Sequence, residues 1–201
     1  MLFDHFAVSA LTLDQAIAHV EEKLGVKMGP GGQHGHFATH NRLIGLEDGL
    51  YLEAIAADPS VPAPGYPRWF DLDSFSGAPR ITNWICRVED LEATLSEVPK
   101  GAGMPVSLTR GDLRWKMAVP ETGKLPCDGA FPALIQWQTD KLPGLTLPSV
   151  GLRLTRFEIA HPEATWLRQT LPIHDDRLVF VPGDAAFQAT FDGPSGVRTL
   201  R

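Results

Sequence analysis

Hydrophobic and polar positions alternate with strand and helix periods from the beginning of the chain. Residues 2–10, "LFDHFAVSA", alternate at every second position, which predicts a strand with Asp4 and His5 on opposite faces. Residues 13–24 then carry apolar side chains at helical spacing. Thr12 begins this helix with a capping box, and Gly25 is a suitable residue to end it. The pattern therefore predicts a strand followed by a helix.

A loop and a hairpin follow this helix. Residues 27–37 are rich in glycine and histidine, which is typical of a mobile loop. Residues 38–56, "ATHNRLIGLEDGLYLEAIA", read as two strands joined at Asp48-Gly49, the strongest short hairpin signal. We take residues 1–57 as the first module.

The same order of elements then recurs. Residues 58–79 form a proline-rich connector in which regular structure is not expected. Residues 80–140 again predict a strand, a helix and three strands, and we take them as a second module. Residues 141–201 predict a shorter β-α-β-β block that ends in a hairpin with "PGD" as its turn. We expect this block to be a partial module with a packing role.

The two modules can be aligned by the starts of their helices, which sets Leu13 over Leu91. This alignment places His5 opposite Asn83. At the other end of the modules, "LYLEAIA" lies over "ALIQWQT", which sets Glu53 opposite Gln136. An internal duplication changes the prediction of the whole fold, so these four polar positions are predicted to converge in one cavity.

Glu53 stands out because a carboxylate is costly inside a buried strand. It shares the strand parity of Tyr51 and Ile55, opposite to Leu52 and Ala54. The aliphatic set suits the helix of the module, so Glu53 is predicted to point away from that helix, on the same side as His5. A mutual hydrogen bond between Glu53 and His5 with no further role is the simpler alternative.

Composition and charge narrow the classes of function. The formal net charge is −6 and no basic patch is visible, which argues against nucleic acid as a partner. No apolar run is long enough to span a membrane, and no signal peptide is recognised. The chain has two cysteines, which we interpret as free thiols of a cytoplasmic protein. A catalytic role for Cys127 is the less favoured alternative.

The patterned segments resemble a known family. "ATHNRLIGLEDGLYLEAIAADP" and "PRWFDLD" are similar to the motifs "GTHNxLIGL…DGxYLELIAPDP" and "PRWFGLD" of the glyoxalase-like branch of the vicinal-oxygen-chelate superfamily. The resemblance covers about residues 1–140. It implies an α+β fold of two β-α-β-β-β modules that form a cupped mixed sheet, here with the C-terminal extension.

The resemblance also implies a divalent metal in the cup, held by one residue from the first strand and one from the last strand of each module. By position these residues would be His5, Glu53, Asn83 and Gln136. Amide oxygens are weaker ligands than imidazole or carboxylate groups, so the sequence offers half a metal site. We expect a metal at His5 and Glu53 to be weakly bound and not retained.

Further candidates surround these positions. By resemblance to the "THN" motif, His40 and Asn41 are expected to contact substrate, whereas His34 and His36 are expected to belong to the loop. Arg110 and Arg114 are candidates for binding a carboxylate or phosphate, with an exposed turn as the alternative. Apolar contacts could come from Trp69, Phe70, Trp84 and Trp137, of which at least half should belong to the core.

These features predict a glyoxalase-like enzyme that acts on a small molecule, by lyase or isomerase chemistry. Glu53 is the expected base, His5 its catalytic partner, and Asn83 and Gln136 donors to substrate oxygens. A non-catalytic protein that sequesters a small molecule is the main alternative. A dioxygenase is less favoured, because iron would need two histidines and a carboxylate. We also expect a homodimer.

Overall fold

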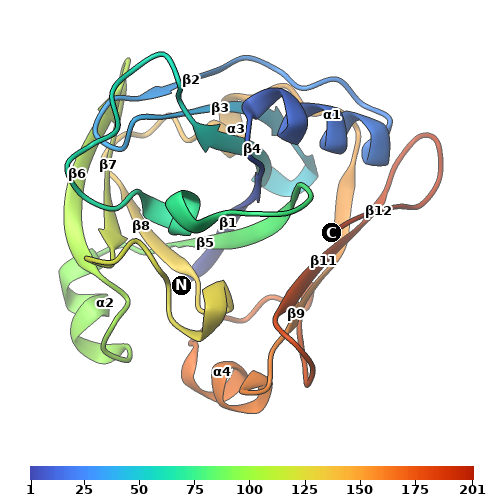
Figure 1. Ribbon diagram of the computed structural model, residues 1–201. Helices are drawn as coiled ribbons and strands as arrows, with labels where there is room; N and C mark the ends of the chain where they lie inside the picture. Colours follow the sequence, from blue (N-terminus) through green and yellow to red (C-terminus); the bar gives the residue numbers. More distant parts are fainter.

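The computed structural model describes residues 1–201 and contains one large and one small β-sheet. The large sheet is strongly curved, and the small sheet packs against its convex face (Figure 1). The predicted α+β class is confirmed. The strands are β1 (Leu2–Ser9), β2 (Gly31–His34), β3 (Thr39–Gly45), β4 (Tyr51–Ala57), β5 (Arg80–Arg87), β6 (Met104–Arg110), β7 (Leu113–Val119), β8 (Ala133–Trp137), β9 (Arg153–Ala160), β10 (Leu178–Val181), β11 (Ala186–Asp192) and β12 (Arg198–Leu200). The α-helices are α1 (Leu13–Leu24), α2 (Leu91–Glu97), α3 (Pro143–Thr146) and α4 (Ala164–Thr170).

The large sheet shows the duplication directly. Its strand order is β2-β3-β4-β1-β5-β8-β7-β6, so each module contributes four strands in mirrored order. Within each module the first strand runs parallel to the last, β1 beside β4 and β5 beside β8. The modules join through antiparallel pairing of β1 with β5. The two predicted β-α-β-β-β modules therefore form one cup.

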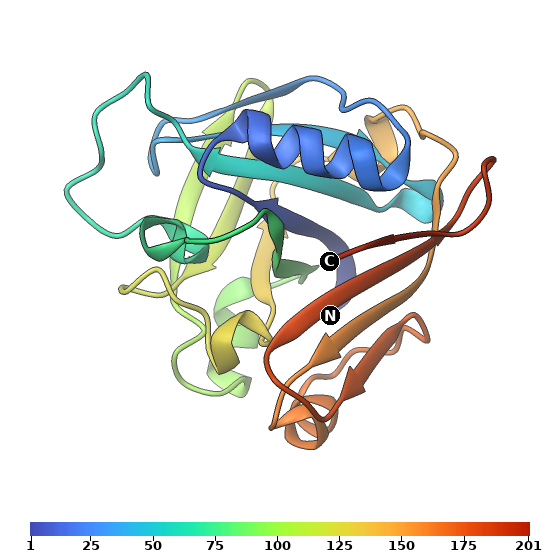
Figure 2. The ribbon, with the colours of Figure 1, turned by 45° about the vertical axis from the view of Figure 1, so that its right-hand side comes forward.

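Local signals place α1 as expected. The Thr12 hydroxyl accepts a hydrogen bond from the backbone N–H of Gln15, and Gly25 ends the helix in the left-handed conformation with φ 69°. The helix buries Ala16, Val20 and Leu24 against the convex face of the sheet. Figure 2 shows α1 lying across β3 and β4.

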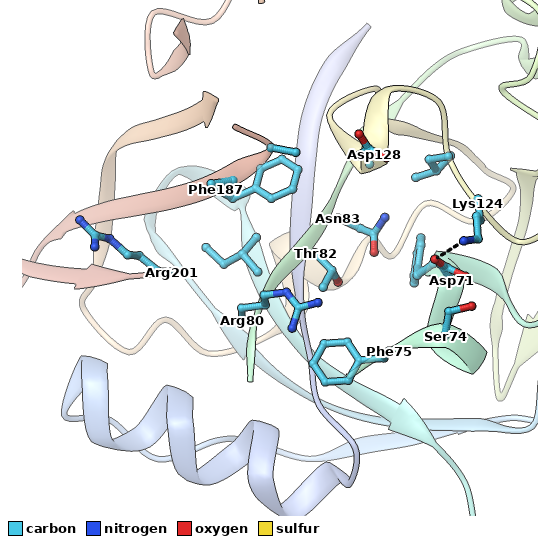
Figure 3. A pocket seen from close by; sticks show the side chains of 16 residues that line it. Asp71, Ser74, Phe75, Arg80, Thr82, Asn83, Lys124, Asp128, Phe187 and Arg201 are labelled. Atoms are coloured by element: carbon cyan, nitrogen blue, oxygen red, sulfur yellow. Dashed lines mark ion pairs between the residues drawn. The ribbon is translucent and has the colours of Figure 1, made fainter. Parts of the chain in front are cut away.

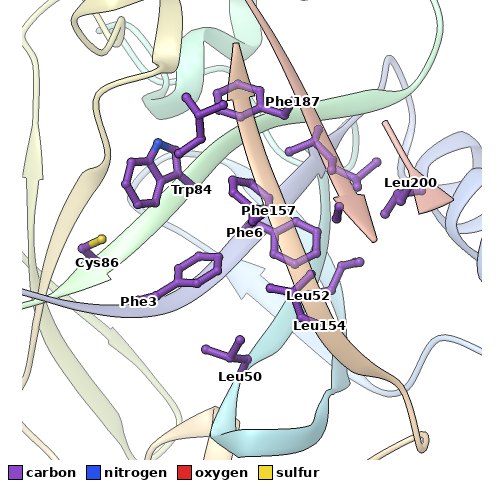
Figure 4. Packing of buried hydrophobic residues seen from close by; sticks show 14 of the residues in the cluster. Phe3, Phe6, Leu50, Leu52, Trp84, Cys86, Leu154, Phe157, Phe187 and Leu200 are labelled. Atoms are coloured by element: carbon purple, nitrogen blue, oxygen red, sulfur yellow. The ribbon is translucent and has the colours of Figure 1, made fainter. Parts of the chain in front are cut away.

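The sheet separates two hydrophobic cores. The larger lies between its convex face, the helices and the small sheet, where Phe3 and Phe6 of β1 meet Trp84 of β5 and Phe157 of β9 (Figure 4). The smaller core fills the concave side with Ile55, Ile85, Ile135 and aromatic residues of the connector. The concave side is therefore a packed interior.

The C-terminal block differs from its prediction in strand pairing. Its strand order is β10-β9-β11-β12, so β9 lies between β10 and β11. β10 runs parallel to β9 and β11 antiparallel to it, so "PGD" at residues 182–184 does not close a hairpin. β9 leads to β10 by a crossover through α4, and the chain then passes to β11 on the other side of β9. Two strands joined by a turn have the same apolar pattern whether or not they pair with each other, so the sequence could not exclude the hairpin.

The glycine-rich segment also differs from its prediction, because it contains β2. A β-carbon at Gly31 would lie 1.8 Å from the Asn41 carbonyl oxygen, and one at Gly32 would lie 2.7 Å from the Arg110 side chain. Glycine here permits close approach of strands and of Arg110 rather than mobility.

The connector contains one short turn of helix, Trp69–Ser74, in which Phe70 and Asp71 have φ of 60° and 53°. No helix of the protein is both long and apolar enough to cross a membrane.

Candidate functional site

Glu53 lies on the concave face of the cup, as its parity predicts. Its neighbours Leu52 and Ala54 belong to the convex core, and Ile55 belongs to the concave core. Glu53 is only 5% exposed. Its Oε1 accepts a 2.5 Å hydrogen bond from the Asn41 side-chain amide on β3. Burying a carboxyl group is costly unless hydrogen-bonding or ionic partners compensate, so the residues around Glu53 determine whether it is stable there.

His5 is the nearest titratable partner of Glu53, with Nε2 3.9 Å from Glu53 Oε2. The other ring nitrogen, Nδ1, lies 2.7 Å from Oδ1 of the buried Asp4. An Asp–His pair of this kind orients the imidazole and here directs its second nitrogen toward Glu53.

Asp4 was predicted on the face opposite to His5, and this prediction is wrong. The pairing of β1 with β5 shifts register between Phe3 and His5, which is a bulge at Asp4. The carboxylate consequently reaches His5, accepts a 3.2 Å hydrogen bond from Trp137 Nε1 and lies 3.6 Å from Arg87 Nη1. Asp4 therefore links β1 to both central strands of the second module.

Tyr51 completes this side of the cluster. Its ring stacks on His5 with centroids 4.1 Å apart, and its hydroxyl lies 3.4 Å from His5 Nε2. Burial, followed by the nearby Asp4 and Glu53 carboxylates, raises the pKa of Tyr51 well above its ordinary value. The hydroxyl therefore stays protonated and can donate a hydrogen bond.

Arg110 enters the cup from β6. Its Nη1 donates to Asn41 Oδ1 at 3.1 Å and lies 3.1 Å from Nε2 of His34. Burial, the Arg110 charge and His5 lower the pKa of His34 to about 3. His34 is thus a neutral acceptor for Arg110, with Nδ1 3.1 Å from the Thr39 hydroxyl. The expectation that His34 belongs to a loop is wrong, because β2 carries it inward.

The cavity left among these side chains is small, about 30 Å³. The first module lines it with polar side chains and Leu43, and the second module and the connector line it with aromatic and aliphatic side chains and Arg110. Trp69, Phe70, Trp115, Met117, Ile135 and Trp137 make up the apolar wall. Arg110 is the one charged side chain that the second module contributes to this lining. Trp84, by contrast, belongs to the convex core.

Two predicted contacts of the second module lie outside this cavity, so the predicted convergence of four residues is wrong. Gln136 faces away from the cup, where its Nε2 donates to the Glu89 carbonyl at 2.7 Å and its Oε1 accepts from Leu91 N–H at 3.3 Å. It therefore stabilises the start of α2. Asn83 on β5 is the strand partner of Ala7 on β1, and its side chain lines a different pocket.

His40 and Arg114 are also placed elsewhere. Neighbouring strand residues point to opposite faces, so Asn41 and His40 cannot both face the cup. His40 instead lies 4.0 Å from Asp58. Arg114 is exposed on β7, next to the buried Trp115. The binding roles proposed for these two residues in the cup have no geometric support.

Sequence reasoning missed three members of the cluster, namely Asp4, Tyr51 and His34. The parity of Tyr51 is the same as that of Glu53, so this residue could have been found. Asp4 needed the bulge and His34 needed the short strand β2, and neither has a local signal in the sequence.

The residues present do not make a metal centre. Nowhere in the chain do three His, Cys, Asp or Glu side chains form a group that could hold a metal ion. His5 and Glu53 supply two donors, and the second module faces them with Ile135 and Trp137. A transition-metal site of this superfamily type needs more donors than these two.

The cysteines stand apart from the cluster. Cys86 and Cys127 are both free thiols, and burial raises the pKa of each above its ordinary value. A thiol with a raised pKa is a poor nucleophile near neutral pH.

Comparison with known proteins identifies the family. A family model described as "Glyoxalase-like domain" matches residues 3–173. No curated protein matches the sequence. Among solved structures, a hypothetical protein from Staphylococcus aureus is similar over 94% of this chain and 80% of its own, with 14% identity and a TM-score of 0.59.

Two epimerase structures are also similar. Methylmalonyl-CoA epimerase from Mycobacterium tuberculosis has 18% identity and a TM-score of 0.43, over 67% of this chain and 85% of its own. A Streptomyces coelicolor methylmalonyl-CoA epimerase variant in complex with 2-nitronate-propionyl-CoA has 11% identity and a TM-score of 0.45, over 70% and 95%. At these identities the likeness concerns the fold alone.

Proposed function

This chain belongs to the glyoxalase-like domain family, and we propose that it is an enzyme that moves a proton on a small molecule bound in the cup. Because the cavity of about 30 Å³ has room for little more than one water molecule, the proposal includes a movement of the apolar wall that admits the substrate. The substrate class is a carbonyl compound with a second oxygen on the neighbouring carbon. Glu53 is the proposed base and His5 its catalytic partner.

The observation that supports the proposal is the arrangement of Glu53 and His5. Glu53 is buried on the concave face, and its Oε2 faces His5 Nε2 at 3.9 Å. Asp4 holds the opposite nitrogen of His5 at 2.7 Å. A purely structural pair would be expected to form a direct hydrogen bond, whereas this separation exceeds hydrogen-bond length.

The chemistry balances without a further reactant. The C–H bond next to the carbonyl breaks and its proton passes to the Glu53 carboxylate. Its electron pair forms a carbon–carbon double bond, while the π pair of the carbonyl moves to the oxygen. The Tyr51 hydroxyl, His5 and the Arg110 guanidinium surround the place where this oxyanion would form. The proton then returns to the same or the adjacent carbon. Preorganised donors of this kind stabilise developing negative charge.

Arg110 has a particular place in this proposal. The family resemblance implies a metal as the electrophile, and the donor set here does not fit one. A guanidinium is always charged and matches the two oxygens of a carboxylate or an enediolate in bidentate geometry. Arg110 is held by Asn41, which also binds Glu53, so base and cation are positioned by one amide.

A second candidate function is sequestration of a small molecule without chemistry. It is favoured by the wall of Trp69, Phe70, Trp115 and Trp137, because aromatic side chains bind apolar ligands with no need for a base.

Proton exchange distinguishes the two functions. The protein is incubated in D₂O with a panel of 2-hydroxy aldehydes, 2-oxo acids and α-hydroxy ketones, and loss of the C–H signal is followed by NMR. We expect exchange with the wild type, and a Glu53→Gln variant that is slower by about 10²–10⁴-fold because the base is lost. Glu92→Gln, an exposed carboxylate beside Lys116, is the matched control.

Two outcomes would contradict the enzyme. One is exchange by Glu53→Gln at the wild-type rate. The other is binding of panel members in the cup without any exchange, which would support the sequestering protein.

A further inference from the structure

A second and larger pocket lies outside the His5–Glu53 cluster. Its volume is about 440 Å³, within the range of small-molecule sites. It forms where the connector turn, the start of β5, the loop before β8 and the start of β11 meet (Figure 3). The C-terminal block therefore lines part of this pocket.

Asn83 is the unusual residue of this pocket. It is 3% exposed, and its Oδ1 is buried without any hydrogen-bond partner in the protein. An unpaired buried amide is destabilising, so such groups usually have a partner. In Figure 3 the amide points into the pocket between the two sides that carry Asp71 and Asp128. A ligand with a hydroxyl group could both donate to this amide and accept from it.

Three cationic side chains line the pocket, and they differ in how they are paired. Arg201 donates through Nε to Gln188 Oε1 at 2.7 Å. Lys124 lies 3.2 Å from Asp71, which neutralises it. Arg80 has no carboxylate partner. Its Nη1 donates to the backbone carbonyls of Ser76 at 2.7 Å and Ala78 at 3.2 Å, and its guanidinium lies 4.5 Å from the Phe75 ring centroid. A fixed arginine without an ionic partner is suited to bind an anion.

The remaining acid at the rim does not neutralise Arg80. The Asp128 side chain is 82% exposed and lies 3.8 Å from His161 Nε2. Aromatic rings of Phe70, Phe75 and Phe187 supply the apolar surface of the pocket. These rings favour a planar apolar body between the anionic end and the hydroxyl.

We propose that this pocket binds a small aromatic carboxylate that also carries a hydroxyl group. The carboxylate pairs with Arg80, the ring packs among the phenylalanines, and the hydroxyl satisfies Asn83. The proposal is independent of proton transfer in the cup. Phe70 lines both cavities, so the two sites share one wall.

Three matched probes test this assignment by NMR titration of the labelled protein. 4-Hydroxyphenylacetate carries both polar groups, phenylacetate lacks the hydroxyl, and 2-(4-hydroxyphenyl)ethanol lacks the charge. We expect the first to bind with millimolar affinity and to shift the backbone signals of Thr82, Gly129 and Phe187. Phenylacetate should bind about fivefold more weakly and the alcohol about tenfold more weakly, since one neutral and one charged contact are lost.

Variants assign the contacts. Asn83→Leu should erase the difference between the two acids and raise Tm by about 2–4 °C, because it removes an unpaired buried amide. Arg80→Gln should erase the preference for the acid over the alcohol. Arg42→Gln, an exposed arginine on β3, is the matched control and should bind as the wild type does. Glu53→Gln should also bind unchanged, which separates this proposal from the proposed function.

The proposal is overturned if 4-hydroxyphenylacetate causes no shifts at tens of millimolar, or if its shifts map away from this pocket. It is equally overturned if Asn83→Leu keeps the preference for the hydroxylated acid.

Discussion

The two modules of the large sheet share their order of elements, yet they face the cup with side chains of opposite character. The first module presents His5, His34, Asn41, Tyr51 and Glu53. Asn41 is hydrogen-bonded to His34 and Glu53, and Tyr51 to His5, and the two groups meet where His5 faces Glu53. The second module presents an apolar wall with Arg110 as its one charge. The two polar residues of this module that were expected in the cup lie outside it. Gln136 stabilises the start of α2, and Asn83 lines the second pocket.

The difference teaches that a duplicated backbone does not require duplicated chemistry. Burying polar groups is costly, and only one half of this cup carries that cost. Four predictions test the contrast, from the largest expected effect to the smallest.

Acid should destabilise the polar half through His34. Its pKa is lowered to about 3 in the folded protein, from 6.5. Between pH 6.5 and pH 3 the His34 imidazole is therefore protonated in the unfolded chain and neutral in the folded protein. This contribution to stability is present above pH 6.5 and is lost as the pH falls toward 3. Between pH 7 and pH 4.5 the loss should be about 3 kcal/mol.

Urea unfolding at the two pH values measures this effect. His34→Gln should show a smaller drop than the wild type, whereas His36→Gln, an exposed histidine two residues away, should keep the full drop. An unchanged drop in His34→Gln would assign the acid sensitivity to other groups.

Asp4 connects the two halves, and its charge should be worth about 2 kcal/mol in the free energy of unfolding. Asp4→Asn keeps the shape but weakens the contacts with His5, Trp137 and Arg87. Asp14→Asn, an exposed acid in the first turn of α1, is the control and should cost only a few tenths of a kcal/mol. Equal losses in both variants would show that the Asp4 contacts contribute little.

A new donor in the second half should convert the cup toward metal binding. Ile85 pairs directly with His5 across the junction of the modules. We expect the wild type to retain no stoichiometric Zn²⁺ or Ni²⁺ after dialysis. Ile85→His should bind Zn²⁺ at least about tenfold more tightly, or about 1.4 kcal/mol, since imidazole is a good ligand.

Calorimetry and elemental analysis measure this change, with Ile85→Val as the size control. Stoichiometric metal in the dialysed wild type would contradict the one-sided description of the cup.

Gln136 should matter for stability and not for the cup. Gln136→Met removes two hydrogen bonds at the start of α2 and should lower the free energy of unfolding by about 1 kcal/mol. Proton exchange that depends on Glu53 should stay at the wild-type rate. A large fall in the rate of proton exchange would show that Gln136 contributes to the site in the cup.

Features set by neighbouring residues were predictable from the sequence. The caps at Thr12 and Gly25 and the parity of Glu53 depend on a few consecutive positions, and the structure has them as expected. The family motifs lie in the same segments. The large curved sheet was implied by the resemblance to the family, and the repeated order of elements agrees with it.

Features set by pairing between distant strands were not predictable. Alignment by helix starts says nothing of the face that Gln136 takes on β8, and a shift of one residue reverses that face. The bulge at Asp4 arises from its pairing with β5. The glycines at 31 and 32 indicate a loop until the neighbouring Asn41 carbonyl and Arg110 are known.

The junction of β1 with β5 has a consequence for synthesis of the protein on the ribosome. β1 emerges first, but it pairs with β4 and β5, and its Phe3 packs on Phe157 of β9 with ring centroids 5.3 Å apart. Such non-local contacts cannot form until the later strands have been translated. The strand that carries Asp4 and His5 is therefore synthesised first, but its pairing is completed near the end of translation. The His5–Glu53 cluster consequently assembles only on a nearly finished chain.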